Sequence, residues 1–146
     1  MPRSRGDGTR TLEYRLPGEW GEWTVLVGLS DDDNDRLSLK VAHQDDWWFH
    51  VRGMPGSHVL LRAIEKVEPD RQTLERAAAI AAYHSKARSG GVVAVSCTRA
   101  RYVTKPRGAK PGTVQIRKEE VLQVRPRLPE EPPRAPTGGT TDRDPP

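Results

Sequence analysis

Three side chains in the segment Trp47 to Arg52 could contact a ligand: an indole, an imidazole and a guanidinium. The segment is rich in aromatic and β-branched residues and predicts a strand, whose successive side chains point to opposite faces. Trp48, His50 and Arg52 would then share one face, and the other face is apolar. Such a trio can stack on bases and hold phosphates of single-stranded or loop RNA. The alternative is that Trp48 packs in the core under a helix and that Arg52 is only solvated.

The residues that follow, Met54 to Ser57, have the composition of a tight turn between two strands. Proline fixes φ at the second position of such a turn, and Gly56 allows a positive φ at the third. Gly56, Ser57 and His58 could offer backbone N–H groups and a hydroxyl to a phosphate, because a turn of small residues leaves the backbone accessible. A turn with a purely structural role is the alternative.

His50 and His58 could face each other across this turn, as the residues of a metal or catalytic site would. A metal site needs three or four well-spaced ligands, and neither a cysteine nor a regularly spaced carboxylate accompanies the pair. Ser57 and His58 form no triad either, since adjacent side chains of a strand point to opposite faces. We expect hydrogen-bonded structural histidines, no catalytic residue, no metal and no cofactor. A hydrolase that uses both histidines with Asp45 or Asp46 is a less favoured alternative.

The C-terminal half of the chain is strongly basic. From His84 to Arg125 it has ten Lys and Arg residues against two Glu, whereas the whole chain has 24 basic and 20 acidic residues. Pro and Gly separate the cations of residues 105–112, which should keep this loop exposed and its charges available to a polyanion. The cations that we expect to hold phosphates, besides Arg52, are Lys86, Arg88, Lys105, Arg107 and Lys110. A solvated charged loop without a partner is the alternative.

Six aspartates gather in the N-terminal half instead: Asp31, Asp32, Asp33, Asp35, Asp45 and Asp46. They lack the spacing of a calcium-binding loop, so we expect them to cap turns and to keep that edge of the protein soluble. A role in attracting magnesium is the alternative.

The elements that must hold these residues are mainly strands, because apolar residues recur with period two in short runs bounded by Gly, Pro, Asn and Asp. We expect strands over Trp23 to Gly28, Leu37 to Val41, Trp47 to Val51, His58 to Arg62, Val92 to Thr98, Thr113 to Ile116 and Glu120 to Val124. Short connections favour antiparallel pairing.

The alanine-rich segment Leu74 to Ala87 predicts one principal helix, with Asp70 or Thr73 as its N-cap and Gly90 as its stop. The expected fold class is α+β: a mainly antiparallel sheet covered by this helix in a single domain.

Both ends of the chain differ from the middle in composition. Residues 125–146 hold seven of the 13 prolines, and residues 1–11 are polar, so neither end buries enough apolar area to offset its chain entropy. We therefore expect a folded domain over residues 12–124 with disordered ends over 1–11 and 125–146. A single cysteine, Cys97, and no apolar stretch of membrane-spanning length favour a cytoplasmic protein.

Residues 45–62, Asp-Asp-Trp-Trp-Phe-His-Val-Arg-Gly-Met-Pro-Gly-Ser-His-Val-Leu-Leu-Arg, resemble a known family signature. They are similar to the NFACT RNA-binding domain (NFACT-R, DUF814-like), found at the C-terminal end of NFACT-type ribosome quality-control proteins. Three further elements occur in the family's order: the Asn-Asp element of residues 34–40, the Ala-rich helix of 77–86 that ends in Ser-Lys, and the basic Gly-Pro loop of 102–112. One departure is Leu29 after Gly28, where family members usually have a basic residue.

The resemblance implies a module that binds tRNA or large-subunit ribosomal RNA, with the ribosome or an RNA-modification enzyme as further partners. A chain of 146 residues has no room for the large N-terminal domain and coiled coil of those proteins. We therefore expect a stand-alone module that acts in ribosome-associated quality control or RNA modification without catalysis of its own. The main alternative is an adaptor that binds a protein partner through its Pro-rich end and directs its basic face at an acidic protein.

Overall fold

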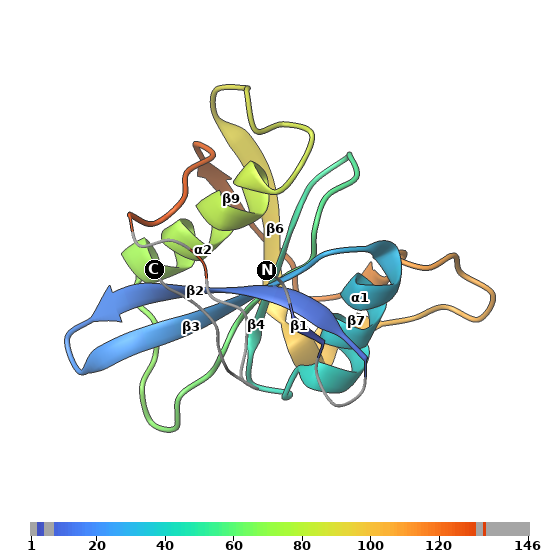
Figure 1. Cartoon of the computed structure of the whole chain (residues 1–146), viewed down its shortest axis with the longest axis horizontal. Coiled ribbons are helices and arrows are strands. Elements are labelled where there is room, and N and C mark those ends of the chain that lie inside the picture. Colours follow the sequence, from blue (N-terminus) through green and yellow to red (C-terminus); the bar gives the residue numbers. More distant parts are fainter. Residues whose placement is uncertain (1–2, 5–7, 131–132, 134–146) are drawn as a thin grey trace.

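A computed structural model describes residues 3–4, 8–130 and 133, and its centre is an antiparallel sheet (Figure 1). Seven strands pair in the order β1-β2-β3-β5-β4-β6-β9. They are β1 (Arg3–Ser4), β2 (Arg10–Gly18), β3 (Gly21–Gly28), β4 (Trp47–Val51), β5 (Val59–Leu61), β6 (Val93–Arg99) and β9 (Glu120–Val124). Strands β7 (Val103–Thr104) and β8 (Gln115–Ile116) pair separately as a short ribbon.

The principal helix, α2 (Arg71–Tyr83), packs on one face of the sheet (Figure 1). Asp70 caps it by accepting a 2.8 Å hydrogen bond from Thr73 N–H. The buried alanines of residues 77–82 let the helix backbone approach the apolar side chains of the strands. The predicted α+β class, with a mainly antiparallel sheet and one principal helix, is confirmed.

The helix ends earlier than predicted. His84, with φ −90° and ψ 45°, leaves the helical conformation, so the helix stops at Tyr83 and the predicted stop at Gly90 is wrong. The ring of His84 is instead fixed against the sheet, because its Nε2 lies 2.8 Å from the hydroxyl of Tyr14. The chain between His84 and β6 is thus released from the helix as a loop.

The opposite face of the sheet has a second, smaller apolar cluster. Its buried members are Leu26, Leu37, Trp48, Leu60 and Val103. It packs against α1 (Asp31–Arg36), the π-helical turn η1 (Leu37–Val41) and the connection that contains the 3-10 turn η2 (Ala100–Tyr102) and β7–β8. Both faces of the central strands are therefore covered.

The strand predicted over Leu37 to Val41 is wrong. Leu37 and Ser38 are buried and the next two residues are exposed, a pattern that fits a helical turn and not the alternation of a strand. Ser30 caps the preceding helix by accepting a 3.1 Å hydrogen bond from Asp33 N–H, so the chain is already helical when it reaches Leu37.

The folded part extends beyond the predicted limits of residues 12 and 124. Strand β2 begins at Arg10, and Thr9 and Thr11 are buried. At the other end, Arg127 N–H donates to Ala79 O at 3.2 Å and Leu128 packs against the core. The rest of both predicted disordered ends, residues 1–2, 5–7, 131–132 and 134–146, lies outside the described residues. None of the described helices is long and apolar enough to cross a membrane.

Candidate nucleic-acid interface

A chain of hydrogen bonds crosses the smaller apolar cluster. Trp48 Nε1–H donates to Ser38 Oγ at 2.8 Å, Ser38 Oγ lies 2.7 Å from His58 Nδ1, and His58 Nε2 lies 3.2 Å from Gly112 O. A carbonyl oxygen only accepts, so Nε2 carries the proton of His58 and Nδ1 accepts the proton of the Ser38 hydroxyl. All four groups are satisfied with His58 as a neutral ring.

This chain of hydrogen bonds gives the side chains of Trp48 and His58 a structural role, which favours the alternative expected for Trp48, a core residue, over direct contact with RNA. The two side chains are only 3% and 2% exposed. The predicted alternation is correct, since Phe49 and Val51 belong to the cluster under α2 and Trp48 to the cluster on the other face. That second face is closed by α1, η1 and the η2–β8 connection, so Trp48 is a core residue, although it does not lie under α2. Both side chains are part of the buried framework on which the loops of the site rest.

Asn34 fixes the backbone next to His58. Its Oδ1 accepts a 3.0 Å hydrogen bond from His58 N–H, and its Nδ2 lies 3.5 Å from Gly56 O. A Cβ at Gly28 would collide with this Oδ1, so only glycine permits the close approach. The Asn-Asp element is thus part of the framework of the site.

The connection between β4 and β5 is wider than the tight turn predicted from Met54 to Ser57. Pairing of the two strands stops at Phe49 and Val59, which leaves residues 50–58 outside the ladder. A positive φ occurs at Gly53 (77°) and not at Gly56.

Two of the backbone amides that were predicted to hold a phosphate on this loop are already hydrogen-bonded within the protein. Ser57 N–H donates to His84 O at 3.0 Å, and His58 N–H is occupied by Asn34, so neither amide is free. Gly56 bridges to Ser85, and a Cβ at Gly56 would lie 3.0 Å from the Ser85 Cβ. These residues attach the loop to the end of α2.

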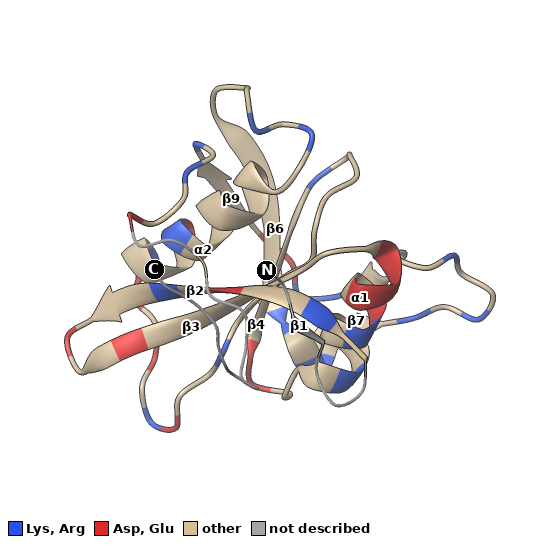
Figure 2. Ribbon diagram, in the orientation of Figure 1, with Lys and Arg blue, Asp and Glu red and all other residues tan. Residues whose placement is uncertain are grey.

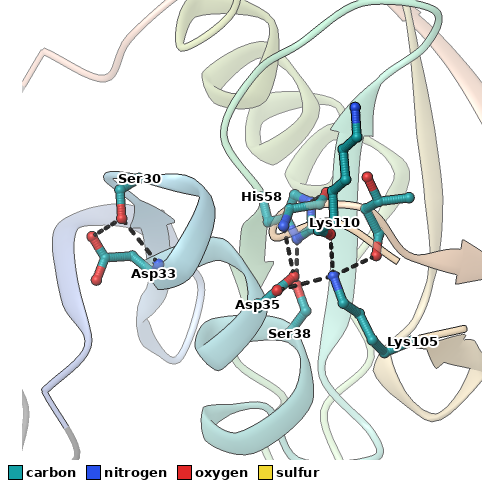
Figure 3. Close-up of polar contacts among 9 residues, drawn as sticks. Ser30, Asp33, Asp35, Ser38, His58, Lys105 and Lys110 are labelled. Atoms are coloured by element: carbon teal, nitrogen blue, oxygen red, sulfur yellow. Dashed lines mark hydrogen bonds and ion pairs between the residues drawn. The ribbon is translucent and has the colours of Figure 1, made fainter. Parts of the chain in front are cut away.

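Asp35 holds both ends of the basic loop 105–112 (Figure 3). Its Oδ2 lies 3.0 Å from Lys105 Nζ, and its Oδ1 accepts a 2.9 Å hydrogen bond from Gly112 N–H. Lys105 Nζ also donates to Lys110 O and, at 3.0 Å, to Thr113 O. The loop is therefore closed on itself and anchored to α1.

Lys105 is consequently not available as predicted. Its charge is neutralised by Asp35 and its side chain is only a quarter exposed. The prediction of a free cation fails here because proline and glycine keep a loop exposed without deciding where each of its side chains points. Lys105 is a positioning residue for Arg107 and Lys110, which are both exposed.

The remaining predicted cations lie on three loops that project away from the tip of the β2–β3 hairpin, two of them upward and the third to the right in Figure 2. We call the loops 52–58, 84–90 and 105–112 the basic rim; its exposed cations are Arg52, Lys86, Arg88, Arg107 and Lys110. Contacts between Ser57 and His84 join the first two loops. The structure shows no acidic partner for the four cations other than Arg52 within the part of the chain that it describes.

Arg52 is half exposed and has one acidic neighbour. Its Nε lies 3.2 Å from Glu119 Oε2, and the same carboxylate oxygen accepts a hydrogen bond from Ser96 Oγ. Glu119 thus orients the guanidinium from one side, and the rest of the group faces solvent.

A hollow of about 310 Å³ lies between the first and third loops of the basic rim. His50, Arg52 and Gly53 line it from β4 and its loop, and Ser96 lines it from β6. The end of the basic loop and β8 contribute Gly112, Thr113, Val114 and Ile116. A larger hollow of about 760 Å³ lies between α2, the β2–β3 hairpin and residues 125–130. Its charges are mixed and it includes none of the predicted site residues, so the smaller hollow is the better candidate.

Burial controls the protonation of the two histidines. Burial lowers the pKa of His50. Hydrogen bonds to the backbone of Gly56 and Val51 raise this pKa, but their effect is smaller than that of burial. For His58, burial and then the neighbouring His50 lower the pKa to about 4. The rings do face each other as predicted, 5.4 Å apart and nearly perpendicular. Both are neutral near pH 7.

The carboxylates that a hydrolase would need are engaged elsewhere. Asp46 pairs with Arg62 at 2.7 Å and accepts hydrogen bonds from His43 N–H and Ala63 N–H, while Asp45 pairs with Arg101. The capping role predicted for Asp46 is therefore correct. No cluster of three or more His, Cys, Asp or Glu side chains suited to a metal occurs among the described residues.

Several residues were given no role in the site from the sequence. Ser38, Asn34 and Asp35 form its framework, and Glu119 orients Arg52. Thr113, Val114 and Ile116 line the hollow. A polar Asn-Asp pair one residue before a Leu-Ser pair, in a segment with alternating apolar residues, is a usable signal for the first three. Glu119 carries no such signal, because its partner is distant in the sequence.

Comparison with known proteins gives two kinds of match. The family described as "NFACT protein RNA binding domain" matches residues 16–118. The chain is 46% identical over 103 residues to the Rqc2 homolog RqcH of Bacillus subtilis and 39% identical over 106 residues to that of Streptococcus suis. These alignments cover 70% and 73% of this chain but only 18% and 19% of the relatives.

A solved structure agrees with the sequence matches. The C-terminal part of the fibronectin/fibrinogen-binding protein from Streptococcus suis superposes with a TM-score of 0.70 at 36% identity, over 79% of this chain and 46% of that one. The family match over residues 16–118 includes β3, β4, β5, β6, α2 and the basic loop together with the signature segments. The chain belongs to the NFACT RNA-binding domain family.

Proposed function

We propose that this chain binds structured RNA, either tRNA or large-subunit ribosomal RNA, through the basic rim and without catalysing a reaction. The observation that carries the proposal is that three loops, distant in sequence, project away from the tip of the β2–β3 hairpin (Figure 2) and carry the exposed cations Arg52, Lys86, Arg88, Arg107 and Lys110. Cations on loops can follow the irregular phosphate path of a folded RNA, and their charge gives most of the affinity.

The predicted site residues divide into two roles under this proposal. The five rim cations contact phosphates. Trp48, Gly56, Ser57, His58 and Lys105 hold the loops that carry those cations. His50 lines the hollow between the loops and is the more exposed of the two rings of the predicted trio, since Trp48 is buried.

The similarity to RqcH proteins supports a role in ribosome-associated quality control, with RNA modification as the other expectation. The aligned region spans about a fifth of those relatives, so the chain would supply the RNA-binding part of such a process. The ribosome or an RNA-modification enzyme would be its further partner.

The test is the salt dependence of binding to total tRNA, measured by fluorescence anisotropy. If about four phosphates are contacted, log Kd should change with log salt with a slope magnitude of about 3 to 4. The double variant Arg107→Glu, Lys110→Glu should bind more weakly and lower the slope magnitude by about 2. Lys105 is left unchanged, because its substitution would also disturb Asp35.

A charge-matched control separates this effect from net charge. Lys66→Glu with Arg76→Glu makes the same charge change on exposed residues away from the rim, and it should keep most of the affinity and the slope. Equal losses in both double variants, or binding that does not depend on salt, would reject the proposed interface.

A further inference from the structure

We propose that the hollow in the basic rim receives one unpaired nucleobase of the bound RNA, with His50 as the stacking ring and Arg52 at the adjoining phosphate. This inference rests on the RNA-binding function proposed above and names what the hollow recognises.

The lining of the hollow suits a base. Its volume of about 310 Å³ is at the lower end of the range for ligand sites, which runs from about 300 to 1,000 Å³. Val114 and Ile116 give apolar contact, while Ser96 and Thr113 carry hydroxyls beside it. A flat heteroaromatic ring with polar edges needs this combination of an apolar surface and a few polar groups.

The ring of His50 is held in place before any ligand binds. Trp48 stacks on it with 6.0 Å between centroids and 23° between planes, and His58 meets it edge-on at 5.4 Å. The bonds from Trp48 through Ser38 to His58 fix both supporting rings in turn. Stacking on a ring that is already ordered costs little conformational entropy.

Burial lowers the pKa of His50, so the ring is uncharged near pH 7. A neutral imidazole favours contact with the face or edge of a base over pairing with a phosphate. The positive charge at the hollow is supplied by Arg52, whose guanidinium is half exposed beside His50. His50 would thus contact the base, and Arg52 would contact the phosphate.

The position of the hollow favours a base within a polynucleotide over a free nucleotide. Arg107 and Lys110 extend from the same loop that ends at the hollow, and Lys86 and Arg88 lie on the loop attached to the end of α2. Cations spread over three loops exceed what one nucleotide can contact. They suit a folded RNA that places a single unpaired residue in the centre.

The probe is an RNA hairpin with a 3′ extension of four adenosines, compared with the same hairpin whose four extension nucleotides are abasic. Both carry the same phosphates, so their difference in affinity reports base contacts alone. The full chain should bind the adenosine probe roughly 5- to 100-fold more tightly, as expected for the stacking of one base. This ratio should change little with salt, because base stacking releases no counterions.

Two substitutions test the site. Val114→Trp, which fills the hollow, and His50→Ala, which removes the stacking ring, should each reduce the adenosine-to-abasic ratio to about 1. Their unchanged affinity for the abasic probe shows that the rim is still folded. Leu39→Trp, on the exposed side of η1, is the matched control and should leave the ratio as in the original chain.

The outcomes separate the two proposals. Equal affinity of the original chain for both probes, with salt-dependent binding retained, overturns the base site and leaves the RNA-binding function intact. A ratio that survives both Val114→Trp and His50→Ala also overturns it, because the base then binds elsewhere. Failure to bind either probe, or tRNA, overturns the RNA-binding function itself.

Discussion

Asp35 and Gly112 are 77 positions apart in the sequence, yet the carboxylate of Asp35 accepts a 2.9 Å hydrogen bond from the amide of Gly112. The same carboxylate lies 3.0 Å from Lys105 Nζ, at the other end of the loop. One residue of α1 therefore sets where Arg107 and Lys110 are presented.

Asp35→Ala should loosen the loop, because it leaves both the Lys105 ammonium and the Gly112 amide without their partner. We expect the free energy of unfolding to fall by about 2 kcal/mol. Affinity for tRNA should fall roughly fivefold, since the loop cations must then be ordered on binding. Asp35→Asn keeps an acceptor for the Gly112 amide, so its losses of stability and of tRNA affinity should both be smaller. Urea denaturation and anisotropy measure the two effects.

The control for this prediction is Asp32→Ala, an exposed position on the same helix. Asp32→Ala should lower the free energy of unfolding by only a few tenths of a kcal/mol, because it removes a negative charge that interacts favourably with the helix dipole. If Asp35→Ala behaves like Asp32→Ala, Asp35 does not position the loop.

Gly112 and Gly108 form a matched pair for testing the loop conformation. Both have a positive φ, 86° and 78°, but a Cβ at Gly112 would lie 2.9 Å from Asp31 Oδ1, whereas one at Gly108 would meet nothing within 4 Å. Gly108→Ala should cost about 1 kcal/mol of stability from backbone strain alone. Gly112→Ala should cost about 2 to 3 kcal/mol, because the loop is anchored there and cannot relax. Equal costs in urea denaturation would show that the anchor is weak.

The buried, neutral ring of His58 makes the stability of the fold depend on pH. The pKa of His58 is lowered from 6.5 to about 4 by burial and by His50, so the unfolded chain binds more protons than the folded one between these values. The contribution of His58 to the free energy of unfolding is therefore fully present above about pH 6.5. As the pH falls toward 4, the free energy of unfolding decreases by about 3 kcal/mol because of this residue. His50 and His84, whose pKa values are also lowered by burial, act in the same direction.

His58→Gln tests the assignment to this residue. The variant is less stable at pH 7, because the bonds to Ser38 and Gly112 are disturbed, but its stability should change less between pH 6.5 and 4 than that of the original chain. Urea denaturation at several pH values measures both slopes. Identical slopes would mean that other groups cause the acid sensitivity.

The local pattern of the sequence was enough to predict most of the fold. Period-two runs predicted β3, β4, β5, β6 and β9, and the alanine-rich segment predicted α2. The failure at Leu37 to Val41 has a physical cause. Its three apolar residues alternate as in a strand, but five residues are too few to exclude a helical turn, and the cap at Ser30 decided for a helix. The end of α2 was missed because the ring of His84 bonds Tyr14, a contact 70 positions away.

The site was predictable by residue type but not by orientation. Alternation correctly put Trp48, His50 and Arg52 on one face, but it did not show that α1 and η1 cover the first of them. The cations Arg107 and Lys110 are exposed as predicted, whereas Lys105 turns inward to Asp35. Which cation of a loop stays free depends on long-range partners, and these are set by the tertiary fold.

Removing residues 131–146 should leave RNA binding unchanged. The segment carries two arginines and three acidic residues, so its loss removes no net positive charge, and it begins after the contacts of Arg127 and Leu128 with the core. We expect affinity for tRNA within about twofold of the full chain. An adaptor that uses the Pro-rich end would instead lose its protein partner in this variant.

Removing residues 125–146 is expected to behave differently. It deletes the 3.2 Å hydrogen bond from Arg127 N–H to Ala79 O and the packing of Leu128, which together should cost about 2 kcal/mol of stability. Urea denaturation of the two truncated chains, with anisotropy on tRNA for each, separates a stability effect from a binding effect. Loss of tRNA binding in the shorter deletion, with stability intact, would place part of the interface beyond Glu130 and contradict a footprint limited to the basic rim.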